Sequence, residues 1–195
     1  MIAPVTLEGR IVRLESLSLA HVAGLAAVGL EPELWRWIPT QVANEREMHE
    51  YVETALDELR RGVSLPFAIV ELKTGRVIGS TRYGNIAPEH KRLEIGWTWY
   101  ARDAQRTGAN TEAKYLLLTH AFDVLGMHRV ELKTDALNEK SRNAILRIGA
   151  KQEGIFRRHL VCTSGRVRDT VYFSIIDSEW PAVRERLQSM MQRGP

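Results

Sequence analysis

The chain has 195 residues and a mass of 22.2 kDa, a length typical of one domain, so we expect a single domain over residues 1–195. Hydrophobic residues make up 44% and charged residues 26%, which argues against a disordered or fibrous protein. The 27 basic and 24 acidic residues leave a net charge of +3. That charge is compatible with an anionic ligand, but it is too small to indicate a nucleic-acid-binding protein.

Cysteine content and hydropathy indicate the compartment. The single cysteine, Cys162, excludes an intrachain disulfide and a cysteine-based metal cluster, and it fits a reducing compartment. No apolar run is long enough to cross a membrane, and the start of the sequence lacks the basic-then-apolar pattern of a signal peptide. We therefore expect a soluble cytoplasmic protein with no membrane partner and no metal.

The N-terminal part of the chain predicts a short strand and two helices. Residues 11–14 are typical of a strand, and Ser18 can cap a short helix that follows it. Residues 48–59 carry apolar side chains at i, i+3, i+4, i+7, i+8 and i+11, the clearest helical pattern in the chain. Gly62 is a plausible end for that helix.

The middle of the chain predicts a hairpin and then a parallel crossover. Residues 66–72 and 77–83 are typical of two strands around a glycine-containing turn. Residues 93–100, rich in aromatic and branched side chains, predict a third strand. An apolar stripe over 113–125 predicts a helix, and residues 129–134 predict the next strand. A strand–helix–strand unit of this kind requires a right-handed parallel connection.

The last third of the chain completes the prediction of the fold. Asn138 opens a helix, residues 155–161 and 171–176 form an antiparallel hairpin, and Ser178 caps a final helix over about 178–192. Together the elements predict a mixed α+β fold. We expect a twisted sheet of about six or seven strands with helices on both faces.

The loop over residues 105–113 has the features of a phosphate-binding site. Backbone N–H groups at a helix start lack intrahelical partners, and the helix dipole adds partial positive charge there. Gly108 lets several amides converge on one anion, and Arg102 and Arg106 add charge, so the loop suits a pyrophosphate. The structural alternative is an ordinary loop capped by Thr111, and the loop alone does not decide between the two.

Several short motifs follow one another in a characteristic order. They are Gln105-x-x-Gly108-x-Asn110, Thr111-Glu112-Ala113, Asn138-x-x-Ser141, Ile148-Gly149-Ala150 and Gly165-x-x-Arg168-Asp169. This combination resembles the GNAT superfamily of acetyl-CoA-dependent N-acetyltransferases, and its spacings resemble the branch of ribosomal-protein and alanine N-terminal acetyltransferases. The resemblance covers about residues 7–187. Asn110 departs from it, because the family pattern has glycine or alanine there.

The resemblance implies a GNAT-like fold, acetyl-CoA as co-substrate, and a primary amine as acceptor. The acceptor is either a protein or peptide N-terminus or a small-molecule amine, attacked directly in a ternary complex. A non-catalytic acyl-CoA-binding sensor is the alternative from another functional class. A homodimer, known among relatives, is a further expectation that no feature of the sequence tests.

The resemblance also implies the cofactor-binding residues. The loop would bind the pyrophosphate. The aromatic strand would bind the pantetheine arm and the thioester through its backbone, and the start of the helix at Asn138 would lie near the arm and the sulfur. These residues are Gln105, Arg106, Thr107, Gly108, Ala109, Asn110 and Thr111; Trp97, Thr98 and Trp99; and Asn138 and Ser141. As structural alternatives, the tryptophans pack against helices and Asn138 is a helix N-cap.

Two residues are candidates for acid–base chemistry. Glu94 precedes Ile-Gly in the aromatic strand, where family members carry a glutamate, and it would accept the amine proton directly or through water. Apolar alternation puts Glu94 on the face opposite Leu93 and Ile95, so a surface glutamate or a structural ion pair is an equal alternative. Ser141 would donate a proton to the leaving thiolate.

Trp35 and Trp37 lie in the loop-rich stretch before the long helix, which borders the acceptor site in the resembling fold. They would either wall the acceptor pocket or fasten the helices to the sheet.

Overall fold

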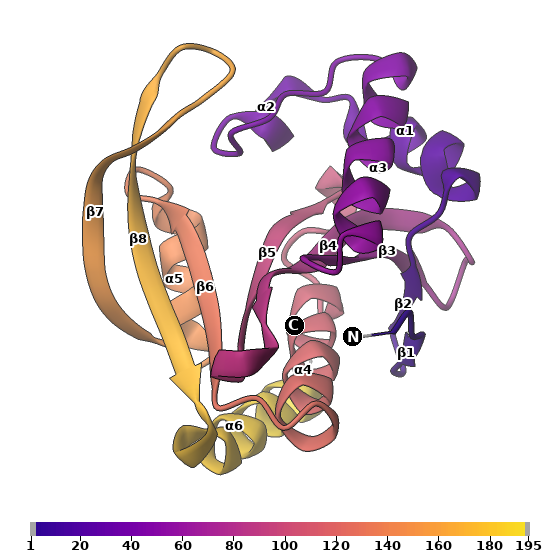
Figure 1. The fold of residues 1–195 in the computed structure, drawn as a ribbon. Coiled ribbons are helices and arrows are strands. Elements are labelled where there is room, and N and C mark those ends of the chain that lie inside the picture. The colour runs from indigo at the N-terminus through magenta and orange to yellow at the C-terminus, as the bar shows by residue number, and fades with distance from the viewer. Residues whose placement is uncertain (1–2, 194–195) are drawn as a thin grey trace.

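The computed structural model describes residues 3–193, which form one eight-stranded sheet with helices on both faces (Figure 1). Residues 1, 2, 194 and 195 of the expected domain lie outside the described part. The strands are β1 (Leu7–Glu8), β2 (Val12–Ser16), β3 (Leu65–Glu71), β4 (Val77–Ala87), β5 (Arg92–Tyr100), β6 (Arg129–Asp135), β7 (Lys151–Val161) and β8 (Val167–Ile176). The α-helices are α1 (Val22–Gly29), α2 (Pro32–Trp35), α3 (Glu45–Arg60), α4 (Ala109–Thr119), α5 (Glu139–Arg147) and α6 (Trp180–Arg193).

The sheet order is β1-β2-β3-β4-β5-β6-β8-β7, and β5 and β6 are its parallel pair. The predicted mixed fold and the central parallel crossover are therefore confirmed. The sheet has one strand more than the seven expected at most, because the two-residue strand β1 pairs with β2. Two residues are too few to show an alternating pattern, so this strand could not be predicted from the sequence.

One predicted helix boundary is wrong, and one predicted helix is not α-helical along its whole length. Ser178 does not cap the final helix, because Asp177–Glu179 form a 3₁₀ turn before α6. The Glu179 carboxylate accepts a hydrogen bond from the Ile176 N–H (3.1 Å) at the start of that turn. The helix expected over 113–125 consists of α4 and a following π-helical turn, His120–Val124. A single apolar stripe does not distinguish these geometries, since both bury nearly the same side chains.

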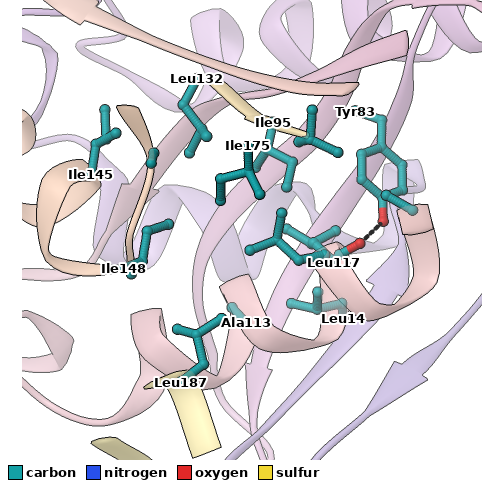
Figure 2. Close-up of a cluster of buried hydrophobic side chains, with 14 of the residues drawn as sticks. Leu14, Tyr83, Ile95, Ala113, Leu117, Leu132, Ile145, Ile148, Ile175 and Leu187 are labelled. Carbon is teal, nitrogen blue, oxygen red and sulfur yellow. Dashed lines mark hydrogen bonds between the residues drawn. The ribbon is translucent and has the colours of Figure 1, made fainter. Parts of the chain in front are cut away.

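The core has two parts, one on each face of the sheet. The larger part packs α4, α5 and α6 against one face, and Figure 2 shows Leu117 of α4 among side chains from several strands. There the buried Tyr83 hydroxyl donates a hydrogen bond to the Leu117 carbonyl (2.6 Å). The smaller part packs α1 and α3 against β3 and the end of β5 on the other face.

A buried carboxylate joins α4 to the N-terminal strands. Glu112 is 4% exposed and accepts hydrogen bonds from the N–H groups of Arg10, Ile11 and Val12 at 2.7–2.8 Å. Gly9 leaves room for this side chain, because a Cβ there would lie 2.4 Å from the Glu112 carboxyl carbon. The turn between β1 and β2 is thereby held against the first turn of α4.

Removing this carboxylate should destabilise the protein. We expect Glu112→Ala to lower the free energy of unfolding by about 2–4 kcal/mol, because three backbone donors lose their acceptor. Glu139→Ala, at an exposed position in the first turn of α5, is the control and should change stability by less than about 0.5 kcal/mol. Urea denaturation measures both, and equal effects of the two substitutions would contradict the assignment.

Candidate active site

The site begins where the two parallel strands separate. β5 and β6 pair only from Arg92 to Glu94 and from Arg129 to Glu131. Beyond these residues a cleft of about 1580 Å³ lies between them, lined by the rest of β5 and by residues 131–134 of β6. The facing strand edges no longer bond to each other, so their backbone N–H and C=O groups are available to a ligand.

A β-bulge in β5 decides which side chains face which helices. Trp97 has φ 50°, and the β4–β5 register shifts between Ser80 and Arg82. Before the bulge Ile95 packs into the core beneath α4, whereas after it Trp99 packs into the core beneath α1 and α3. Thr98 consequently faces α4, where simple alternation from Ile95 would have turned it away.

The Trp97 side chain lies against β4. A Cβ on Gly84 would be 2.3 Å from the Trp97 ring, so glycine is needed for this close approach. The Arg82 guanidinium lies 5.0 Å from the centre of the Trp97 ring and pairs with Glu58 of α3 at 2.9 Å. Trp97 therefore lines the cleft from a position fixed by β4 and α3.

The two N-terminal tryptophans have different positions. Trp35 is 1% exposed, its indole N–H donates to the Gly29 carbonyl (2.7 Å), and its ring lies 5.4 Å from that of Trp99. Trp35 thus fastens the helices to the sheet and does not line the cleft, contrary to the expectation that it walls the pocket. Trp37 does line the cleft.

The segment after α2 meets the tip of the β7–β8 hairpin, which lies far from it in the sequence (Figure 1). The backbone N–H and the hydroxyl of Thr163 both donate to the Pro39 carbonyl at 3.0 Å. The buried Arg168 donates to the Trp37 carbonyl at 3.3 Å. These contacts connect the rims of the cleft on its N-terminal and C-terminal sides.

Glu94 lies in the cleft on the face opposite Leu93 and Ile95, as the alternation predicted. It is 6% exposed, and its Oε2 accepts from the Asn85 amide (2.5 Å) and pairs with the Lys133 ammonium (2.9 Å). The structure therefore shows the ion pair of the second alternative and places this carboxylate beside the cleft.

Lys133 is a charged group between two carboxylates. It lies 2.9 Å from Glu94 and 3.3 Å from Glu131, with its ammonium 4.5 Å from the centre of the Tyr172 ring. Burial lowers the pKa of Lys133, but the two carboxylates raise it more, so the net shift is upward. Lys133 is thus protonated at neutral pH.

The loop before α4 presents amides at the helix start, but not by the expected geometry. Gly108 is the N-cap with φ −66°, and the positive φ of the loop belongs to Arg106 (61°). Thr111 is not the cap; its buried hydroxyl accepts from Arg147 (3.1 Å). The Thr107 hydroxyl accepts from the Ala109 N–H (3.2 Å). Within residues 3–193, the N–H groups of residues 106–108 have no backbone acceptor.

The loop side chains divide between the cleft and the protein interior. Gln105, Arg106 and Asn110 line the cleft, whereas Ala109 is buried in the core. The Gln105 amide donates to the Tyr100 carbonyl (3.1 Å), and its oxygen accepts from Lys140 (2.5 Å). Gln105 thereby fixes the start of the loop to the end of β5.

Asn138 and Ser141 lie together at the start of α5 and line the cleft. Asn138 is the N-cap, and its Oδ1 accepts from the Ser141 N–H (3.1 Å). The cap leaves the Asn138 amide nitrogen and the Ser141 hydroxyl without hydrogen-bond partners among the described residues, so both are available to a ligand.

Sequence reasoning missed Lys114. This residue of α4 is 7% exposed, lines the cleft, and donates to the Thr98 hydroxyl (3.1 Å), which in turn bonds to Thr81 (2.8 Å). Burial lowers its pKa to about 7. A signal was present, because Lys114 precedes Leu117 and Leu118 by three and four residues and so belongs to the buried helix face.

The described residues contain no group of three or more histidine, cysteine, aspartate or glutamate side chains that could hold a metal ion. Of the helices in residues 3–193, none has the length and apolar character needed to cross a bilayer.

Comparison with known proteins identifies the family. Residues 12–151 match the model of the acetyltransferase (GNAT) domain. The chain belongs to the GNAT acetyltransferase family. YdaF of Bacillus subtilis (strain 168), provisionally named a ribosomal N-acetyltransferase, is 32% identical over 139 residues, which are 70% of this chain and 75% of YdaF.

Solved structures of GNAT proteins agree in fold. A GCN5-related N-acetyltransferase from Brucella melitensis is 34% identical with a TM-score of 0.91, over 97% of this chain and 86% of that one. RimJ of Mycobacterium smegmatis, solved in complex with CoA-disulfide, is 25% identical with a TM-score of 0.83, over 95% and 94% of the two chains. This GNAT protein is an acetyl-CoA-dependent acetyltransferase.

Replacing Lys114 should make the protein more stable at neutral pH. Its pKa in the folded protein, about 7, lies below the ordinary lysine value of 10.5, so the unfolded chain binds more protons between these values and stability rises with pH there. We expect Lys114→Met to raise the free energy of unfolding by about 1–3 kcal/mol at pH 7, and by less at pH 10. Denaturation of both proteins at the two pH values measures this, and an equal effect at both would contradict the buried-amine assignment.

Charge at the helix start should control cofactor binding. We expect Gly108→Asp to weaken acetyl-CoA binding at least about tenfold, because a carboxylate at the N-cap repels a phosphate. Gly108→Asn is the matched control, since it adds a neutral side chain of the same size that is also a good N-cap. Calorimetric titration measures both affinities, and equal losses would mean that size rather than charge is responsible.

Proposed function

We propose that the protein transfers an acetyl group from acetyl-CoA to a primary amine by direct attack in a ternary complex. The observation that carries this proposal is the buried Glu94 carboxylate, which shares one cleft with the N-terminus of α4. Moving an acetyl group from a phosphate-bearing thioester to an amine requires two features. One is a group that accepts the amine proton, and the other is an anion-binding helix end that holds the phosphates.

The cofactor half of the cleft has the groups needed to bind acetyl-CoA, which supplies the activated acyl thioester. The amides of residues 106–108 suit the diphosphate, and the free strand edge of β5 from Trp97 to Trp99 suits the polar groups of the pantetheine arm. Asn138 and Ser141 border the same cleft from α5. In this proposal Asn138 binds the arm and Ser141 donates a proton to the leaving sulfur.

The acceptor half contains Glu94, Lys133 and Trp37. The amine must be neutral to attack, and Glu94 takes its proton directly or through one water. Lys133 holds the carboxylate in place, and Trp37 forms part of the wall beside the amine. The chain needs no covalent intermediate for this reaction.

The cleft is large enough for both reactants. Its volume of about 1580 Å³ exceeds the roughly 300–1,000 Å³ of typical small-ligand pockets. The name of YdaF, a ribosomal N-acetyltransferase, favours a ribosomal acceptor such as a protein N-terminus, and a small-molecule amine is the alternative. Cytoplasmic location and a homodimer remain predictions from the sequence.

Neutralising Glu94 should slow the reaction without affecting cofactor binding. With the best acceptor from a screen of N-terminal peptides and small amines, we expect Glu94→Gln to lower kcat about 100-fold or more, since general bases contribute about 10²–10⁴-fold. Its affinity for acetyl-CoA should stay within about twofold. Release of CoA thiol measures turnover, and calorimetry measures binding.

Glu131→Gln is the matched control, because Glu131 also pairs with Lys133 (3.3 Å). A similar loss of activity in both variants would assign the effect to Lys133 rather than to a base. Full activity of Glu94→Gln would refute the proposed role. Binding of acetyl-CoA with no transfer to any acceptor, by the unmodified protein, would support the sensor alternative.

A further inference from the structure

Lys114 differs from the other lysines of the cleft. Its amine is buried on the α4 side of β5, and it donates a hydrogen bond to a neutral group, the Thr98 hydroxyl. Lys133 lies between two carboxylates, and Lys140 is exposed and bonded to Gln105. In the described part of the chain, no aspartate or glutamate comes within 4.0 Å of the Lys114 nitrogen.

The charged and titratable groups on α4 and β5 do not neutralise a positive charge on the Lys114 amine. On α4, Glu112 is occupied by the backbone N–H groups of Arg10, Ile11 and Val12. On β5, burial raises the pKa of Tyr100, so this residue is neutral.

The neighbouring groups on α5 and the π-helical turn do not help either. Lys140 in the first turn of α5 and Arg147 at its end are themselves cationic. His120 stacks on Tyr83, and burial lowers the pKa of its imidazole. A positive charge on Lys114 therefore has no anionic partner within the described protein.

The position of Lys114 relates it to the anion-binding end of α4. It follows Asn110 by four residues on the same helix face, and both line the cleft. The Lys114 amine lies on the Thr98 hydroxyl of β5 (3.1 Å), and long side chains in helices lean toward the N-terminus, so the amine extends back along α4 in the direction of its anion-binding end.

We propose that Lys114 is the counter-charge that this fold reserves for the diphosphate of acetyl-CoA, and that it takes up a proton when the cofactor binds. This inference rests on the proposed position of the cofactor at the N-terminus of α4. In this proposal Lys114 is a cofactor-binding residue, and the anion that pairs with its ammonium is the cofactor diphosphate rather than a carboxylate of the protein.

A proton balance follows from this assignment. In the free protein the amine is mostly neutral at pH 8, because burial lowers its pKa to about 7. An anion nearby favours the charged form, so the bound protein is protonated at the same pH. Binding at pH 8 should thus be accompanied by net proton uptake, and affinity for acetyl-CoA should fall as pH rises from 7.5 to 9.

The test is calorimetric titration with acetyl-CoA, without an acceptor, in two buffers of different ionisation heat at pH 8. The dependence of the heat on the buffer gives the number of protons exchanged. Lys114→Met is the informative variant, and Lys140→Met, which removes an exposed lysine from the same cleft, is the control. We expect Lys114→Met to abolish the uptake and weaken binding about tenfold at pH 7.5, with Lys140→Met retaining the full uptake.

Two results would overturn this inference while leaving the proposed function intact: tight binding with no proton uptake, or the same uptake in Lys114→Met as in the unmodified protein. Absence of acetyl-CoA binding by the unmodified protein would instead refute the proposed cofactor site itself.

Discussion

The separation of β5 and β6 after three paired residues is the constraint on which the rest of the site depends. Each strand remains paired on its other edge, β5 with β4 and β6 with β8, so the gap costs the sheet only the bonds between these two strands. Those unused backbone groups would be a penalty if they were buried without partners. Facing a cleft, they become a surface to which a ligand with amide groups can bind, which fits an acetyltransferase of the GNAT family.

The bulge at Trp97 is the second constraint on the site, because the residues after it point to the opposite faces of the sheet from those that regular alternation would give. Trp99 is directed to the α1 and α3 side, where it anchors Trp35, and Thr98 is directed to α4, where it meets Lys114. One irregular residue thereby connects the cleft to both parts of the core. A regular strand would bury Thr98 away from Lys114 and leave that amine without its hydroxyl partner.

Lys114, which is buried, and Lys133, which is partly exposed, show how local charge decides the chemistry of a lysine in the cleft. Lys133 is held in its charged form by Glu94 and Glu131, and so it can orient the carboxylate that the proposed reaction uses. Lys114 has only a hydroxyl, so burial acts on it unopposed and its pKa falls to about 7. The same residue type therefore gives a fixed charge on one side of the sheet and a proton-exchanging group on the other.

The sequence by itself determined the fold class, the parallel crossover, the tail hairpin and the order of the family motifs, because these depend on local periodicity and on short spacings. It also put Glu94 on the face opposite Leu93 and Ile95, which the bulge leaves unchanged because it begins after Glu94. Tertiary structure alone decided that Trp35 is buried while Trp37 faces the cleft, that Arg106 rather than Gly108 takes the positive φ, and that Lys133 reaches Glu94. It also decided the environment of Lys114. These outcomes depend on contacts between residues that are far apart in the chain and meet around the separated strands. No local sequence pattern encodes the distance, burial and charge at such contacts.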